Sequence, residues 1–424
     1  MRNYKPRIID SLIEKKLKGK GALLIEGPKW SGKKTSAQQV ANSTLDLTNP
    51  EDLENNLSLI EINPALLLQG EVPRLIDEWQ IAPKLWDAVR FEVDQRSDEG
   101  QFILTGSSTP VNSNEITHTG TGRFAWLLMR PMSLYESDDS TGDVSIKQLF
   151  NTPDKIAAIN SLDIQKIAFL VCRGGWPRSI FLEDDLALEQ AYDYYDAIVK
   201  MDISKVDGVH RDSERVKQLL RSYARNQGQQ VSLKHIRADM LANDTDTLSI
   251  DTVSSYINAL KKIFVIEDSL AWNPNLRSKS AIRTSDTRYF IDPSIGVAAL
   301  GIGPNDLISD LETFGFLFES LCIRDLRIYA QAINGNVFHY RDKSGLECDA
   351  VIHLRNGSYG LVEIKLGGDK LIEEGAQTLM KLNSKLDTNK MKSPSFMMIL
   401  CGVGNYAYRR KDGIYVVPIG CLKD

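Results

Sequence analysis

Residues 27–36 read GPKWSGKKTS, and this stretch constrains the fold because its glycines and lysine have nearly the spacing of a phosphate-binding loop. Gly27, Gly32 and Lys33 match the pattern GxxxxGK. Lys34, however, stands where the pattern requires a serine or threonine. The first question is therefore whether the rest of the sequence gives this altered loop the setting of a nucleotide site.

A working phosphate loop leaves a strand and enters a helix, because its backbone N–H groups surround the anion at that junction. The apolar run ALLIE at residues 22–26 predicts a buried parallel strand, and residues 33–41 predict a helix. This setting favours a nucleotide site. A glycine-rich turn without a ligand has the same short pattern, so the loop alone does not decide the matter.

Two further apolar runs predict strands that end in polar residues. Residues 73–80, PRLIDEWQ, include Asp77 and Glu78, which suit a magnesium ligand and a base that activates water. Two solvated acids at a strand end would give the same pattern. Residues 101–108, QFILTGSS, end in small polar residues, among them Thr105, that can contact a phosphate or the attacking water. These features occur in the order that a P-loop ATPase needs.

A family resemblance appears when these motifs are taken together. The series GPKWSGKKT, LIDEWQ, FILTGSS, GRFAWLLMRPMSLYE and CRGGWPRSI resembles the bacterial and archaeal AAA+-type ATP-binding proteins that carry a C-terminal domain of unknown function. The resemblance covers nearly the whole chain and implies an α/β P-loop ATPase domain over residues 1–150. It also implies that Asp77 and Glu78 handle Mg²⁺ and water. The residues that it implies for ATP binding are Gly27, Pro28, Lys29, Ser31, Gly32, Lys33, Lys34, Thr35, Asp77 and Thr105.

Arg123 is a candidate arginine finger, which would reach the γ-phosphate of ATP from the same subunit or from a neighbouring one. A finger acting between subunits would suit a homo-oligomer. The alternative is a surface arginine on the glycine-rich turn GTGRF. The sequence leaves both interpretations open.

The chain departs from the family at residue 34, where a serine or threonine hydroxyl usually ligates Mg²⁺. Lys34 cannot replace that hydroxyl, because an ammonium group donates hydrogen bonds and accepts none. Thr35 comes one residue later, and a helix step of about 100° turns its hydroxyl elsewhere. The sequence therefore supports ATP binding more strongly than Mg²⁺-dependent hydrolysis.

The middle of the chain predicts two helical modules. Residues 151–212 predict helices, and the resemblance implies that these helices form a lid on the ATPase domain. Residues 213–300 predict three helices followed by two strand-like runs, 264–270 and 288–291, which is the order of a winged helix. Such a module binds double-stranded DNA or only joins domains, and the sequence leaves both roles open. The basic residues that would contact DNA phosphates are Lys261, Lys262, Arg277, Lys279 and Arg283.

Residues 301–424 predict a second site, built on a long amphipathic helix and paired strands. Glu363 and Lys365 lie two residues apart, so on a strand they share a face, and Asp349 on the neighbouring strand can join them. Two carboxylates and a lysine suit metal-dependent cleavage of phosphodiesters, with Glu319 on the helix as a further ligand. This D…ExK pattern resembles the PD-(D/E)xK restriction-endonuclease-like fold, although an exposed strand of mixed charge has the same short motif.

Composition places the chain among ordinary globular proteins, with 42% apolar residues and a net charge of −5 that excludes a globally basic nucleic-acid coat. Five widely spaced cysteines without a CxxC pair disfavour a disulfide framework and a zinc site, and favour a cytoplasmic location. No apolar run approaches the roughly 20 residues that span a bilayer, so we expect no membrane partner.

Three functional hypotheses follow. The first is a Mg²⁺-dependent ATPase that acts on DNA or is regulated by DNA, with a metal-dependent nuclease site at Asp349, Glu363 and Lys365. The second is a nucleotide-dependent interaction switch with an inactive nuclease-like domain, which Lys34 favours. The third is a nuclease held silent by ATP.

Overall fold

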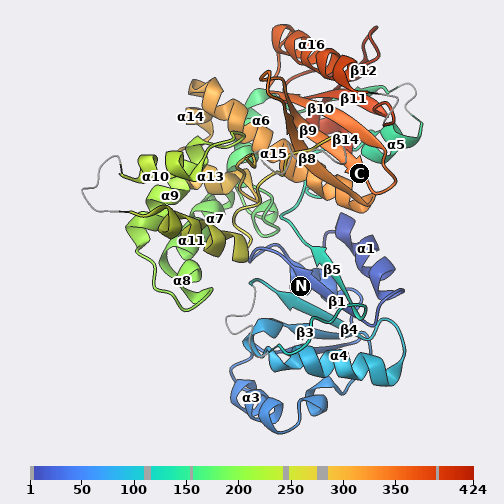
Figure 1. Ribbon diagram of the computed structural model, residues 1–424, viewed down its shortest axis with the longest axis vertical. Helices are drawn as coiled ribbons and strands as arrows, with labels where there is room; N and C mark the ends of the chain where they lie inside the picture. The colour runs from blue at the N-terminus through green and yellow to red at the C-terminus, as the bar shows by residue number, and fades with distance from the viewer. Residues whose placement is uncertain (1–3, 109–115, 153–155, 242–247, 275–284, 388–390) are drawn as a thin grey trace. The chain divides into compact units, whose positions relative to one another are not determined.

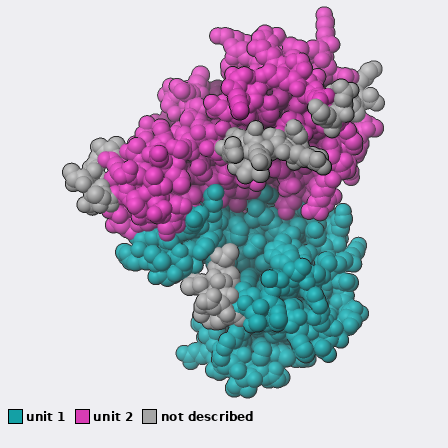
Figure 2. Space-filling model, in the orientation of Figure 1, with its two compact units in different colours: residues 1–131, 200–211, 258–265 teal, residues 132–199, 212–257, 266–424 magenta. Residues whose placement is uncertain are grey.

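The computed structural model describes the chain as two compact units, and Figure 2 distinguishes them by colour. Unit 1 comprises residues 1–131, 200–211 and 258–265, and unit 2 comprises residues 132–199, 212–257 and 266–424. The residues that the structure describes are 4–108, 116–152, 156–241, 248–274, 285–387 and 391–424. No helix among them is both long and apolar enough to cross a membrane.

Unit 1 is built on a parallel sheet of five strands in the order β2-β3-β4-β1-β5 (Figure 1). The strands are β1 (Ala22–Glu26), β2 (Ser43–Asp46), β3 (Arg74–Asp77), β4 (Phe102–Gly106) and β5 (Phe124–Leu128). The predicted strand at residues 22–26 is confirmed with the same bounds. Because the strands are parallel, their carboxyl ends meet at one edge of the sheet, where the loop after β1 begins.

Apolar side chains cover both faces of this sheet, which explains why β1 is apolar throughout. Leu23 and Ile25 pack in one core cluster with residues of α1, and Ala22 and Leu24 pack in another with residues of α3 and α4. Burial on both faces is what a central parallel strand requires. The helices of unit 1 include α1 (Ile8–Leu17), α2 (Lys33–Gln38), α3 (Leu53–Ile62) and α4 (Lys84–Arg96).

Unit 2 contains a mixed sheet of seven strands in the order β7-β12-β13-β11-β10-β9-β8. Strands β8, β9 and β10 are antiparallel neighbours, and β10 pairs with β11 in parallel. Helix α16 connects β10 to β11 and packs on the sheet through Ile372, Ala376, Leu379 and Leu382. The elements are α15 (Leu311–Ala332), β8 (Gly335–Arg341), β9 (Glu347–Leu354), β10 (Tyr359–Lys365), α16 (Asp369–Lys385), β11 (Phe396–Cys401), β12 (Tyr406–Arg409) and β13 (Tyr415–Pro418).

Residues 132–159 belong to unit 2, so the compact units do not follow the expected boundary at residue 150. Strand β6 (Val144–Ser145) pairs in parallel with β14 (Leu422–Lys423), close to the last residue of the sequence. Strand β7 (Ala158–Ile159) extends the seven-stranded sheet by pairing with β12. These pairings tie a segment that follows the first sheet in sequence to the C-terminal part of the chain.

The middle of the chain is helical, as expected. Its helices are α5 (Ile146–Asn151), α6 (Ile164–Arg173), α7 (Asp184–Ala197), α8 (Ile203–Lys205), α9 (Ser213–Arg225), α10 (Leu233–Leu241), α11 (Ile250–Lys262), α13 (Pro293–Leu300) and α14 (Pro304–Ser309). Helix α7 continues into a π-helical turn, Ile198–Asp202.

The two strands predicted at 264–270 and 288–291 do not form as continuous strands. Isolated antiparallel bridges join Ile266 to Phe290 and Ser269 to Thr287 instead. The reason lies at Tyr289, whose backbone N–H donates to the side chain of Asp268, so the backbone bond that Glu267 donates to Tyr289 is not returned. Of the predicted basic residues, Arg277, Lys279 and Arg283 lie outside the described residues.

Helix α15 is not amphipathic along its whole length, contrary to expectation. From Ser320 to Ala330 every residue is buried, including Arg324, Asp325 and Arg327. The charged side chains that would form a solvated face are covered and bound to other buried groups. This is possible because each charge finds a partner in another segment of unit 2.

Candidate functional site

The side chain of Lys33 folds back against the backbone of the loop that follows β1. The Lys33 ammonium donates to the carbonyl oxygens of Gly27, at 2.8 Å, and Pro28, at 2.7 Å. A Cβ atom on Gly27 would lie 2.1 Å from the carbonyl oxygen of Met129, so only glycine fits there. Burial lowers the pKa of Lys33 to about 8, although Glu78 and other nearby carboxylates oppose this shift.

Lys34 lies between two carboxylates at the carboxyl edge of the sheet. Its ammonium group is 2.5 Å from Oδ2 of Asp46 and 3.0 Å from Oδ2 of Asp77. These two aspartates end β2 and β3 and are paired in register. Burial alone would lower the pKa of Lys34, but its hydrogen bonds to Asp46 and Asp77 outweigh this and raise it. Lys34 is therefore a fixed positive charge at the position where the sequence predicted impaired magnesium binding.

The predicted polar residues at the strand ends do come together. Thr105, the residue before the last of β4, pairs in register with Asp77 of β3 and donates a 2.6 Å hydrogen bond to its Oδ1. Ser107 donates to Glu78 at 3.1 Å, and Gln80 also donates to this carboxylate. Glu78 is thus held beside Asp77 by two side chains from the same sheet edge.

Three other residues predicted for nucleotide binding are Ser31, Lys29 and Thr35, and each has a different environment. Ser31 is fully buried and donates to the carbonyl oxygen of Pro28, so it shapes the loop. Lys29 forms a 2.6 Å ion pair with Asp202, which the sequence gave no reason to connect with the loop. Thr35 is exposed, and whether its hydroxyl can take the role of one at position 34 stays a prediction.

The structure does not bring Arg123 to the loop of its own chain. Arg123 precedes β5, and its carbonyl accepts from the N–H of Ala22, at the start of β1. The loop follows the opposite end of β1, so Arg123 lies at the other edge of the sheet. There it forms a 2.8 Å ion pair with Asp94. A finger role from a neighbouring subunit stays a prediction.

A second group of charged side chains lies in unit 2, where β9 and β10 run side by side. Lys365 lies 2.8 Å from Oε2 of Glu363 and 3.2 Å from Oδ2 of Asp349. Asp349 also accepts from the backbone N–H of Ile364, at 2.6 Å. The predicted grouping of Asp349, Glu363 and Lys365 on one face is therefore what the structure shows.

Burial dominates the electrostatics of this second site. It raises the pKa of Glu363 to about 8, helped by the charge of Asp349 and opposed by Lys365. Burial also raises the pKa of Glu319 well above its usual value. Oε1 of Glu363 is buried and has no hydrogen-bonding partner among the described residues.

Glu319 lies close enough to Asp349, Lys365 and Glu363 for their charges to affect its pKa, and it also has a hydrogen-bonding partner on another segment. Its Oε1 accepts a 2.5 Å hydrogen bond from the hydroxyl of Tyr289. In the part of the chain that the structure describes, no three acidic, histidine or cysteine side chains are arranged to hold a metal ion. The Lys365 ammonium lies within ion-pair distance of both Asp349 and Glu363.

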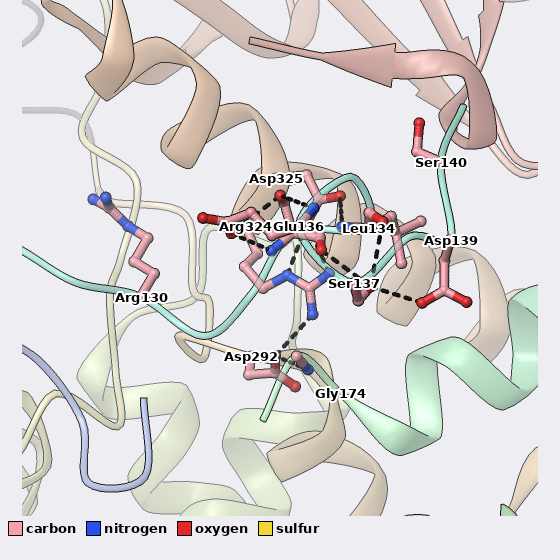
Figure 3. Close-up of polar contacts among 12 residues, drawn as sticks. Arg130, Leu134, Glu136, Ser137, Asp139, Ser140, Gly174, Asp292, Arg324 and Asp325 are labelled. Carbon is pink, nitrogen blue, oxygen red and sulfur yellow. Dashed lines mark hydrogen bonds and ion pairs between the residues drawn. The ribbon is translucent and has the colours of Figure 1, made fainter. Parts of the chain in front are cut away.

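A buried ionic network that the sequence did not predict lies in unit 2 (Figure 3). Arg324 of α15 pairs with Asp325, at 2.8 Å, and with Asp292, at 2.9 Å. Asp292 also accepts from the N–H of Gly175, and Asp325 accepts from the N–H of Leu134.

This network explains the RGGWP motif at residues 173–177. A Cβ atom on Gly175 would lie 2.1 Å from the carbonyl oxygen of Met132, so the residue has to be glycine. Trp176 is buried and donates to the hydroxyl of Ser294. In the sequence, the adjacent glycines Gly174 and Gly175 were the one local feature that indicated this packing.

Comparisons with known proteins identify three regions of the chain. Residues 19–137 match an AAA domain, residues 164–306 match a domain of unknown function (DUF8612), and residues 314–422 match another (DUF4143). Uncharacterized proteins of Mycobacterium bovis and Mycobacterium tuberculosis are each 23% identical to this chain over 348 residues, which is 81% of this chain and 70% of theirs.

A solved Walker-type ATPase of Pyrococcus abyssi is similar at 15% identity and a TM-score of 0.43, over 70% of this chain and 96% of that one. The match to the AAA domain covers the whole parallel sheet and its phosphate loop. The chain therefore contains an AAA-type P-loop ATPase domain.

Proposed function

We propose that this protein binds ATP in the loop at residues 27–35 and hydrolyses it slowly, and that its nucleotide state controls how the rest of the chain engages double-stranded DNA. The observation that carries the nucleotide site is the convergence of Lys33, Asp77 and Thr105 at one edge of the parallel sheet. A P-loop ATPase needs a lysine for phosphate, a carboxylate for metal or water, and a polar residue between them.

DNA contact is assigned to a winged-helix module over residues 213–300. Helices α9, α10 and α11 are followed by antiparallel bridges between residues 266–269 and 287–290, which supports this assignment. Lys261 and Lys262 end α11, where they would contact DNA phosphates. The module then positions the duplex but reads no base sequence.

The C-terminal part is proposed to be restriction-endonuclease-like. The element order α15-β8-β9-β10-α16-β11 surrounds a strand pair that carries Asp349, Glu363 and Lys365, which supports this fold. The unpartnered buried oxygen of Glu363 and the nearby carboxylate of Asp349 suit a hard divalent cation. When bound there, Mg²⁺ would activate a water for phosphodiester cleavage. Asp349 and Glu363 would hold the ion, and Lys365 would orient the water.

A second candidate is a nucleotide-dependent switch that recruits a protein partner and has no nuclease activity. The contact between Lys34 and Asp77 favours it, because this contact engages the carboxylate that an efficient ATPase needs for Mg²⁺. In this candidate the ion pairs of Lys365 with Asp349 and Glu363 are purely structural.

ATP hydrolysis by the purified protein, with and without double-stranded DNA, separates the two candidates. Under the first, turnover is slow, rises with DNA and disappears in Lys33→Ala, while exposed Lys15→Ala in α1 behaves as wild type. A metal-dependent nicking assay on the same samples should lose its signal in Asp349→Asn. ATP binding without any DNA effect or nicking would favour the switch.

A further inference from the structure

The residues around the phosphate loop do not fit a magnesium ion. A P-loop holds Mg²⁺ with a serine or threonine hydroxyl and a strand-end aspartate. Here the hydroxyl position is Lys34, which can only donate. Both oxygens of the aspartate are engaged, since Oδ1 of Asp77 accepts from Thr105 and Oδ2 lies 3.0 Å from the Lys34 ammonium.

The ligand geometry that Mg²⁺ requires conflicts with the position of the Lys34 ammonium. Magnesium needs near-octahedral oxygen ligands at about 2.0–2.1 Å and sheds its water reluctantly. The ammonium group of Lys34 lies within hydrogen-bonding distance of the same carboxylate oxygen, so an ion at that place would lose a ligand and face a like charge. Neither effect arises with threonine at this position.

The ammonium group is itself well placed to act as a cation. Asp46 and Asp77 hold it from the ends of two neighbouring strands. The Lys34 side chain is nevertheless 39% exposed, so one side is open to a ligand. Lys33 precedes it directly in the loop, which places two lysines next to each other in the segment that binds phosphate.

We propose that Lys34 is a built-in replacement for Mg²⁺, so that this site takes a nucleoside di- or triphosphate in its metal-free form. The inference rests on the proposed nucleotide site and adds the form of ligand that the site selects. Lys34 would place one positive charge, held by Asp46 and Asp77, where the metal would carry two, and Lys33 beside it would contact the phosphate. The substitution also explains slow hydrolysis, because no divalent ion bridges the β- and γ-phosphates.

The test compares the affinity of a fluorescent ATP analogue in excess EDTA and in excess MgCl₂. For wild type we expect dissociation constants that agree within about twofold in the two conditions, and for Lys34→Thr an affinity about tenfold higher with MgCl₂. Lys34→Arg keeps a donor-only cation and should retain the wild-type behaviour. Thermal melting of each variant shows whether it is folded.

A second readout follows the metal ion directly and not the fluorescent nucleotide. Binding of Mn²⁺ followed by electron paramagnetic resonance in the presence of ADP should be stronger in Lys34→Thr than in wild type. Measuring both proteins in an Asp349→Asn background removes any contribution from the carboxylates of unit 2.

The outcomes distinguish this inference from the function on which it rests. If wild type binds the analogue about tenfold more tightly with MgCl₂ than with EDTA, Lys34 does not replace the metal, while the nucleotide site stands. Equal metal dependence in wild type and Lys34→Thr would also overturn the inference. If wild type binds no analogue in either condition, the proposed nucleotide site itself fails.

Discussion

Replacing Arg324 with methionine should destabilise unit 2 strongly. The Arg324 side chain is 1% exposed, and Asp292 and Asp325, with which it pairs, are fully buried. Methionine leaves both carboxylates without a counter-charge in a site that excludes water. Breaking a buried pair in this way costs about 3–5 kcal/mol, because the remaining charge keeps its desolvation penalty. We therefore expect the free energy of unfolding of this unit to fall by about 4 kcal/mol.

The loss of stability in Arg324→Met should depend on pH, because the carboxylate of Asp325 can take up a proton. Burial raises the pKa of Asp325 to about 6, and Arg324 opposes that shift. Without the arginine the folded-state pKa rises further above the unfolded value, so the folded variant binds protons that the unfolded chain releases. Its stability therefore increases as pH falls, and the deficit relative to wild type should narrow between pH 7 and pH 5.

Urea unfolding followed by circular dichroism measures this effect. The matched control is Arg341→Met, which removes an ion pair with Glu347 whose side chains are 45% and 50% exposed and should cost less than about 1 kcal/mol. The reasoning is refuted if Arg324→Met and Arg341→Met cost the same, or if the deficit of Arg324→Met widens as pH falls.

Three further predictions concern the two sites. Because the pKa of Lys33 is lowered to about 8 in the free protein and bound phosphate raises it, ATP affinity should change little between about pH 7 and 8, where ATP stays fully ionised, and fall about tenfold per pH unit above pH 8, as titrations across this range would show. Gly27→Ala forces a Cβ atom toward the carbonyl oxygen of Met129 and should weaken ATP binding at least about tenfold in the same assay. Lys365→Met removes the ammonium that Asp349 and Glu363 share and should lower unfolding stability by about 3 kcal/mol in urea titrations at pH 9, above the pKa of about 8 at which Glu363 ionises in wild type; an unchanged midpoint would mean that this ion pair contributes nothing.

Sequence patterns located the strands that matter most for function. The apolar run at residues 22–26 became a strand with the same bounds, because a central buried strand needs apolar residues on consecutive positions. The alternation of side chains along a strand also placed Glu363 and Lys365 on one face, with Asp349 beside them.

The partner of Lys34 could not be predicted in the same way. Asp46 ends a four-residue strand, STLD, that has almost no apolar pattern. Its position beside Asp77 depends on the register between β2 and β3, which is set by packing and not by local sequence. The sequence therefore identified Lys34 as a departure but not what holds it.

The network around Arg324 was missed for a related reason. Its members come from segments far apart in the chain, and a charged residue in a helix pattern is normally assigned to the solvated face. Asp292 and Gly175 contact each other only because the fold brings their segments together. The lid and winged-helix boundaries, by contrast, stay predictions.

The most direct test of the account is the affinity of the full chain for ATP, measured by isothermal titration calorimetry on wild type and Lys33→Ala, with Lys15→Ala as the matched control. The account predicts saturable binding in wild type and Lys15→Ala, and an affinity at least about tenfold lower in folded Lys33→Ala. Equal affinity in all three proteins, or no binding in wild type, would contradict it.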